Sequence, residues 1–196
     1  SIITISHASY SGGAEIAEKV AASLNYRSAD REVLIEASRR YGIPEAKYEE
    51  ILTTEGHWWE RWLESLRLYR ITLQAAMCEV AQGGSVVYYG RAGQELFPGI
   101  SHVLKVLIVA PIEYRMQEVK ARKGLEGESA RHFLKELDRV RNRRLRALFN
   151  ADWLDPVGYD LVLNSSRIGT ESAARAITEL VRGQEFQPTA ESEKSF

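Results

Sequence analysis

The stretch SIITISHASYSGGAEIAEKV, residues 1–20, decides the fold class of this chain. An apolar run at residues 2–5 predicts a buried strand, and a helical pattern follows a small-residue loop at residues 6–13. A strand, a glycine-containing loop and a helix in this order can hold a phosphate, because the first turn of a helix leaves backbone N–H groups unpaired. The alternative is a plain strand–helix turn, which the loop alone does not exclude.

The loop departs from the nucleotide-binding motif G-x-x-x-x-G-K-[ST] at its last two positions. In that motif the lysine reaches the outer phosphates and the hydroxyl binds magnesium. Here Gly13 and Ala14 occupy those places. The residues that could still approach phosphate oxygens through backbone N–H groups or hydroxyls are Ser9, Ser11, Gly12 and Gly13.

Strands and helices alternate along the rest of the chain. Strands are expected at 85–89, 103–110 and 159–164, and helices at 13–24, 31–41, 112–123, 128–149 and 170–181, with a helix-rich region at about 45–82. Strands separated by helices predict an α/β fold in which helices cover both faces of a parallel sheet. Ligands of such folds bind beyond the carboxyl ends of the strands, which is where the loop at 6–13 lies.

Composition is that of an ordinary globular protein. The 196 residues fit one domain, and a net charge of −1 gives no field that would recruit nucleic acid or an anionic membrane. No run reaches the ~18 apolar residues of a membrane helix and no signal peptide is recognisable, so a cytoplasmic protein is expected. Cys78 is the single cysteine, which excludes a cysteine-based metal site. Residues 184–196 are expected to form a polar tail, as a linker or a disordered end.

Several segments resemble the cytidylate kinase-like family, a branch of the P-loop nucleoside monophosphate kinases, over roughly residues 3–181. They are the opening strand with its SGG loop, ADREVL at 29–34, YGRAGQELFPGISHVLKVLIVAPIEYR at 89–115, and DRVRNRRLRALFNADWLDPVGYDLVLNSSRI at 138–168. The resemblance implies a three-layer P-loop kinase-like domain at 1–183. It also implies a helical insert for the acceptor nucleotide at about 45–82 and an arginine-bearing lid at about 125–150.

The resemblance further implies a reaction, since active relatives transfer a phosphoryl group from ATP, with Mg²⁺, to CMP or dCMP. On the matching positions, the donor phosphates would be held by Ser9, Ser11, Gly12 and Gly13. Asp30 and Arg31 would lie near the acceptor nucleoside, and Arg91 would face the acceptor phosphate. The lid candidates are Arg139, Arg141 and Arg144, and no residue is assigned to a metal.

Three residues depart from the family pattern. Gly13 replaces the lysine of the wider class, Ala14 stands where related sequences have arginine, and Tyr89 replaces an aspartate that helps to place the metal. Phosphoryl transfer depends mostly on positioning and charge stabilisation, and loss of one such donor typically costs about 100- to 1000-fold in rate. His7, Arg91 and the lid arginines are the groups that could compensate.

The segment RVRNRRLRA, residues 139–147, contains five arginines. Guanidinium groups pair bidentately with phosphate oxygens, so a mobile helix that carries them could close over a triphosphate. The alternative is a solvated helix face whose arginines pair with Glu136 and Asp138 at helical spacing. An RNA-binding stripe is a third interpretation, which the net charge of −1 disfavours.

Three tryptophans, Trp58, Trp59 and Trp62, lie in the expected insert, within HWWERWLESLRLYR at 57–70. Aromatic residues at helical spacing usually pack into a core. An insert has little core of its own, so the same residues could instead form a homodimer or partner surface. The chain as a whole therefore has two candidate functions: a nucleoside monophosphate kinase-like enzyme, or a domain with this fold that senses a nucleotide or another anion, or binds a partner, without turnover.

Overall fold

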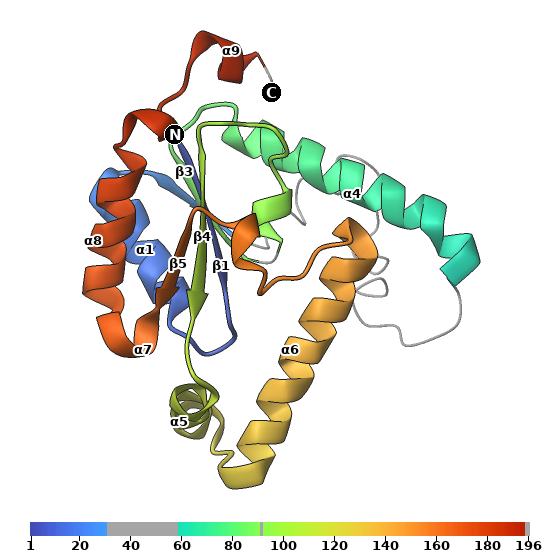
Figure 1. Cartoon of the computed structure of the whole chain (residues 1–196), viewed down its shortest axis with the longest axis vertical. Helices are drawn as coiled ribbons and strands as arrows, with labels where there is room; N and C mark the ends of the chain where they lie inside the picture. The colour runs from blue at the N-terminus through green and yellow to red at the C-terminus, as the bar shows by residue number, and fades with distance from the viewer. Residues whose placement is uncertain (31–58, 91, 195–196) are drawn as a thin grey trace.

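The computed structural model describes residues 1–30, 59–90 and 92–194, with side chains of residues 59–66 outside the description. Five parallel strands form one sheet in the order β2-β3-β1-β4-β5 (Figure 1). The strands are β1 Ile2–His7, β2 Arg27–Ala29, β3 Val86–Gly90, β4 Val103–Val109 and β5 Leu161–Asn164. β1 is the central strand, and its apolar residues are accordingly buried on both faces of the sheet. The predicted parallel α/β sheet is confirmed.

Helices cover both faces of the sheet, as predicted (Figure 1). The helices are α1 Gly13–Leu24, α4 Trp59–Ala81, α5 Ile112–Lys123, α6 Gly127–Phe149, α7 Ser165–Ile168, α8 Thr170–Val181 and α9 Ala190–Glu193. On one face, Ile3 and Ile5 of β1 pack against α1 and α8. On the other, Ile2 packs in a second core with Tyr88 of β3 and the apolar side of α4. Residues that alternate along β1 thus separate the two cores.

The first strand–loop–helix unit forms at the residues that the sequence predicts. Gly12 takes a left-handed backbone conformation, with φ of 77°, at the start of α1. Ile16 and Val20 face the sheet, and α1 ends at Asn25, which is also left-handed. The loop is thereby held between a central strand and a helix that packs on that strand.

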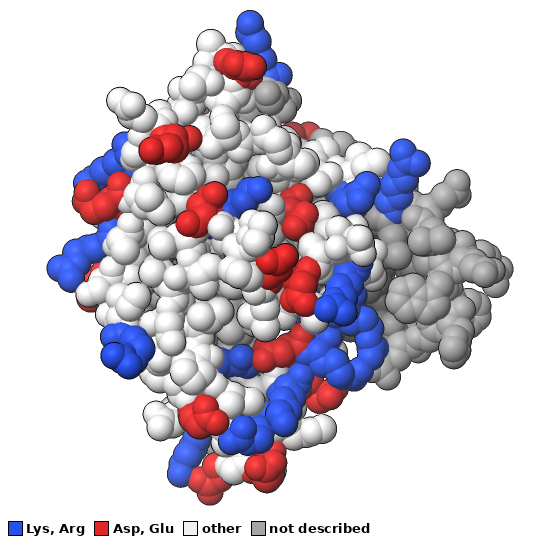
Figure 2. Space-filling view, in the orientation of Figure 1, with Lys and Arg blue, Asp and Glu red and all other residues white. Residues whose placement is uncertain are grey.

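The long helix α6 lies at the side of the sheet and carries a run of charged side chains (Figure 2). Figure 2 shows Lys and Arg side chains along α6 with acidic side chains beside them. Three of its residues are buried: Ala130, Leu134 and Leu145. Arg115 of α5 donates two hydrogen bonds of 2.9 Å to Asp138 of α6. This ion pair joins α5 to α6, the helix that spans the predicted lid region.

The segment at residues 184–194, expected as a polar tail, contains two short helical turns. Residues 184–186 form a 3-10 helix, and α9 follows with a capping box between Thr189 and Ser192. Ser192 is buried, and its hydroxyl lies 2.8 Å from Nδ1 of His102. Local hydrogen bonds thus give residues 184–194 short helical turns, while their role as a polar tail or linker stays a prediction.

Two other predictions lie partly outside the described residues. The helix expected at 31–41 and the first part of the insert, with Trp58, are not described, and nor are the side chains of Trp59 and Trp62. The remainder of the insert forms α4, which ends at Ala81 ahead of Gly83 and Gly84. Among the described helices, none is long and apolar enough to span a bilayer.

Candidate phosphate and nucleotide site

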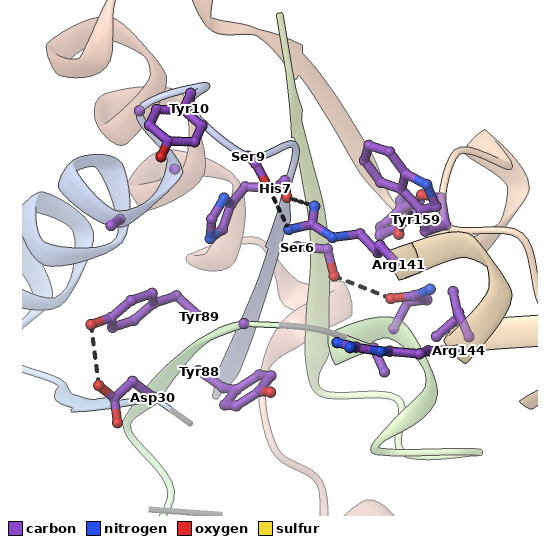
Figure 3. Close-up of a pocket in the computed structure, with 18 of the residues that line it drawn as sticks. Ser6, His7, Ser9, Tyr10, Asp30, Tyr88, Tyr89, Arg141, Arg144 and Tyr159 are labelled. Atoms are coloured by element: carbon purple, nitrogen blue, oxygen red, sulfur yellow. Dashed lines mark hydrogen bonds between the residues drawn. The ribbon is translucent and has the colours of Figure 1, made fainter. Parts of the chain in front are cut away.

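A cavity of about 780 Å³ opens at the carboxyl ends of β1 and β3, in the size range of small-molecule sites (Figure 3). The β1–α1 loop, α1, α4, the end of α5, α6 and the segment before β5 all contribute to its wall. Its charged side chains among the described residues are Glu15, Glu18, Asp30, Arg122, Lys123, Arg141 and Arg144. The cavity therefore lies where parallel α/β folds bind ligands, with cations slightly in excess of carboxylates.

The loop presents some of its small residues to the cavity but not all of them. Ser9, Gly12 and Gly13 line it. Ser11 is fully buried, and both its N–H, at 3.2 Å, and its hydroxyl, at 2.7 Å, donate to the carbonyl of Ala8. Its own carbonyl accepts from Ser165 at 2.7 Å. Ser11 closes the turn, so the structure does not bring this predicted phosphate ligand to the cavity.

Gly13 has no room for a side chain. A Cβ atom built on Gly13 would lie 2.3 Å from Cβ and 2.4 Å from Cγ of His7. The imidazole of His7 lines the cavity beside the loop. Its Nδ1 lies 3.2 Å from the carbonyl oxygen of Ala8, which can only accept, so Nδ1 carries the proton of that hydrogen bond.

Arg141 of α6 binds the loop directly. Its guanidinium donates to the backbone carbonyl of His7 and, at 3.2 Å, to the hydroxyl of Ser9 (Figure 3). The same group lies 5.0 Å from the centre of the Trp153 ring, a distance typical of a cation–π contact. These contacts place a fixed positive charge at the mouth of the loop that lacks the motif lysine.

The arginines of α6 lie on two different faces of the helix. Arg141 and Arg144 line the cavity. Arg139 instead pairs with Glu136 at 2.7 Å and borders a separate surface depression with Arg143 and Arg146. The predicted surface pair of Glu136 and Arg139 therefore forms, and the structure does not bring Arg139 to the cavity.

A sequence signal could have separated the arginines. Arg141 lies seven residues after Leu134 and four before Leu145, which places it on the buried side of α6. Asp138 accepts two hydrogen bonds from Arg115, and the charge of Arg141 also acts on its carboxylate. Burial raises the pKa of Asp138, and the nearby cations only partly oppose this shift.

The end of the cavity beside β2 and β3 is described in part. Asp30 lies directly after β2, and the hydroxyl of Tyr89 donates to its carboxylate at 3.5 Å (Figure 3). Tyr89, where the family pattern would place an aspartate, thus contacts the carboxylate of Asp30. Arg31 and Arg91, the other two predicted acceptor residues, lie outside the described residues.

Several lining residues were not found from the sequence. Ser6 donates to the side chain of Gln94 at 3.1 Å, and Tyr159 donates to the carbonyl of Trp153 at 2.8 Å. Burial raises the pKa of Tyr159 to about 12, so this phenol is a neutral donor at physiological pH. Arg122 and Lys123 reach the cavity from the basic last turn of α5, a pattern that was visible in the sequence.

The lining residues do not fit a magnesium ion held by the protein. No group of three potential ligands from His, Cys, Asp and Glu occurs within the described ranges. Ala14 offers no oxygen at the place of the motif hydroxyl, and Glu15 accepts a hydrogen bond of 2.8 Å from Thr170. The cations and loop N–H groups suit phosphate oxygens better than a bare divalent ion.

Comparison with known proteins gives matches in sequence and in structure. The family model described as "Cytidylate kinase-like family" matches residues 2–167. The cytidylate kinase of Methanopyrus kandleri is 33% identical over 97 residues, so the chain spans about half the length of this curated relative (45% of this chain, 50% of the relative). An uncharacterized protein from Eubacterium ventriosum matches with a TM-score of 0.72 at 18% identity, over 93% of this chain and 99% of that one. Shikimate kinase from Bacteroides thetaiotaomicron matches with a TM-score of 0.55 at 13% identity, over 93% and 98%. At these identities the structural matches show the fold alone.

Proposed function

Because this chain belongs to the cytidylate kinase-like family, we propose that it is a nucleotide kinase-type phosphotransferase that moves the γ-phosphoryl group of ATP to a CMP-like acceptor. The observation that carries the proposal is the contact of Arg141 with the loop at His7 and Ser9, beside the first turn of α1. Mg²⁺ would arrive on the phosphates of ATP, since the described side chains offer no ligand set for it.

The donor end of the cavity supplies charge to the phosphates. The N-terminal end of α1 carries partial positive charge and directs backbone N–H groups outward. Arg141 and Arg144 line the same space and remain charged at any physiological pH. Catalysis by such a site consists of holding the triphosphate in line with the acceptor and stabilising the charge that develops on the transferred group.

The acceptor end suits a cytosine base. A carboxylate accepts a hydrogen bond from the exocyclic amino group of cytosine, which uracil lacks. Asp30, oriented by the hydroxyl of Tyr89, is the described carboxylate at this end of the cavity. The proposal therefore expects CMP to bind more tightly than UMP, and the Asp30→Asn variant to reduce that preference.

A second candidate is a nucleotide- or anion-binding domain without turnover. The observation that favours it is the loss of both the lysine and the hydroxyl of the motif at Gly13 and Ala14. In this case Arg141 would hold a bound phosphate without promoting its transfer. Binding experiments do not separate the two candidates, whereas product formation does.

Calorimetric titration with ATP tests the donor site. We expect the wild type to bind ATP and Arg141→Met to bind it about 10- to 100-fold more weakly, the usual effect of losing a charged hydrogen-bond donor. Arg139→Met is the matched control, because Arg139 lies on the same helix but outside the cavity. Equal affinities of the two variants, or no binding by the wild type, would contradict the proposal.

A further inference from the structure

We propose that His7 takes the place of the motif lysine, so that its imidazole is the side chain that contacts the donor phosphates. This inference rests on the proposed function. It starts from the alignment of the loop with G-x-x-x-x-G-K-[ST], which places His7 at the first position, Gly12 at the sixth and Gly13 at the seventh. Gly12 fits its position, with a φ of 77° that favours glycine. The residue types at the first and seventh positions are exchanged relative to the motif. The motif has glycine first and lysine seventh, whereas this chain has His7 first and Gly13 seventh.

The structure shows why the two positions are coupled. The Cβ atom that any residue other than glycine would add at position 13 lies 2.3 Å from Cβ of His7, 2.4 Å from Cγ and 3.0 Å from Cδ2. Contacts below 3.0 Å essentially never occur for real Cβ atoms. One volume beside the loop therefore accepts a side chain from position 7 or from position 13, but not from both. By the same geometry, a glycine at the first position would leave this volume to a side chain at the seventh, and here His7 fills it.

The imidazole of His7 also points in a suitable direction. It lines the cavity, and Figure 3 shows its ring between Tyr10 of the loop and Tyr89 of β3, on the side of α1. The hydrogen bond of Nδ1 with the carbonyl of Ala8, at 3.2 Å, fixes the ring orientation. Arg141 donates to the backbone carbonyl of the same residue, so its guanidinium lies against the backbone of the residue whose ring lines the cavity. Guanidinium groups donate hydrogen bonds to phosphate oxygens, and because Nδ1 of His7 already donates to Ala8, its Nε2 donates to a phosphate only in the doubly protonated imidazolium, which is the form that the inference requires.

The steric part of the inference can be tested without any ligand. In the wild type, Gly13→Ala should lower Tm by about 3–10 °C, because the added methyl group collides with His7. In the His7→Gly background the same change should leave Tm unchanged or raise it, since alanine favours the helix that begins at residue 13. Gly158→Ala is the control, because its Cβ would lie 3.7 Å from its nearest neighbour, an ordinary contact, and should have the same small effect in both backgrounds. An equal Tm loss from Gly13→Ala in both backgrounds would overturn the claim that side chains at positions 7 and 13 exclude each other.

The phosphate role of His7 is tested by calorimetry with ATP and, for the acceptor end, CMP. We expect His7→Gly to weaken ATP binding at least 10-fold with little change for CMP, and Gly13→Lys alone to give no gain. The double variant His7→Gly/Gly13→Lys restores the motif arrangement and should bind ATP within a few-fold of the wild type. His7→Gly with wild-type ATP affinity would overturn the inference and leave the proposed function standing. No ATP binding by the wild type would contradict the proposed function and the phosphate role of His7 together. The Tm measurements on Gly13→Ala in the two backgrounds would still test whether positions 7 and 13 exclude each other's side chains.

Discussion

Single glycines in this chain are constrained by side chains that the sequence pattern does not show to be in contact with them. Gly13 is excluded from carrying a side chain by His7, and Gly90 by the ring of Tyr88. The substitution at Gly13 was read from the sequence as a lost lysine. Only coordinates show that the space of that side chain is already filled, because the two residues are six positions apart and meet through the loop fold.

Gly90→Ala should lower the free energy of unfolding by about 1–3 kcal/mol, as expected for overpacking. Its Cβ would lie 2.5 Å from the hydroxyl oxygen of Tyr88 and 2.8 Å from Cζ, and Tyr88 is fully buried and cannot move aside. Urea unfolding measures the effect. Gly158→Ala, whose Cβ has ordinary spacing, should change stability by less than about 0.5 kcal/mol. Equal losses in both variants would show that the contact with Tyr88 is not the cause.

Tyr159 should make stability depend on alkaline pH. Its pKa is raised from 10.0 to about 12 in the folded chain, so the folded state retains the phenolic proton longer than the unfolded state does. The contribution is fully present below pH ~10 and is lost as pH rises toward ~12, by up to about 2–3 kcal/mol. Urea unfolding between pH 9 and 12 measures it.

The Tyr159→Phe variant is the comparison for this pH series. It should be less stable at neutral pH by about 1 kcal/mol, because the hydrogen bond to the carbonyl of Trp153 is lost. It should also lose less stability than the wild type as pH rises, since the other tyrosines titrate in both proteins. Parallel pH curves for the two proteins would contradict the assignment.

At the level of elements, periodic patterns in the sequence predicted well where helices begin and end, but poorly which side chains of a helix face the cavity. The predicted ranges 13–24, 112–123 and 170–181 are those of α1, α5 and α8, because each has a regular pattern bounded by a turn residue such as Asn25, Gly124 or Gly169. The arginines of α6 were harder to assign. Which of them reaches the cavity depends on how Leu134 and Leu145 rotate the helix against its neighbours.

The pair of Arg115 and Asp138 should be the strongest electrostatic link between α5 and α6. Its side chains are 6% and 28% exposed, so Asp138→Ala leaves a buried guanidinium without its hydrogen-bonded partner. We expect a loss of about 2–4 kcal/mol in unfolding free energy, somewhat below the range for fully buried pairs because Asp138 is partly solvated. Glu136→Ala, which removes the exposed pair with Arg139, should cost less than about 0.5 kcal/mol. Similar losses from the two substitutions would contradict this ranking.

At the scale of the whole molecule, the sequence predicted the sheet, its parallel strands and the end at which the cavity opens, since these follow from alternating elements and the handedness of their connections. It did not predict the wall of the cavity. Trp153, Tyr159 and Gln94 come from segments that reach the site only through tertiary packing. The short helix α9 was not predicted either, because the Thr189 and Ser192 capping box was not recognised in a polar sequence.

The most direct test of the account is formation of CDP from ATP and CMP, followed by separation of the nucleotides. We predict that the wild type and Arg139→Met form CDP at similar rates, and that Arg141→Met is slower by about 100-fold or more, as expected for removal of one preorganised charge donor. CDP formation that is the same in both arginine variants would contradict the role of Arg141. ATP binding by the wild type without any CDP would contradict phosphoryl transfer to CMP and support the nucleotide-binding alternative.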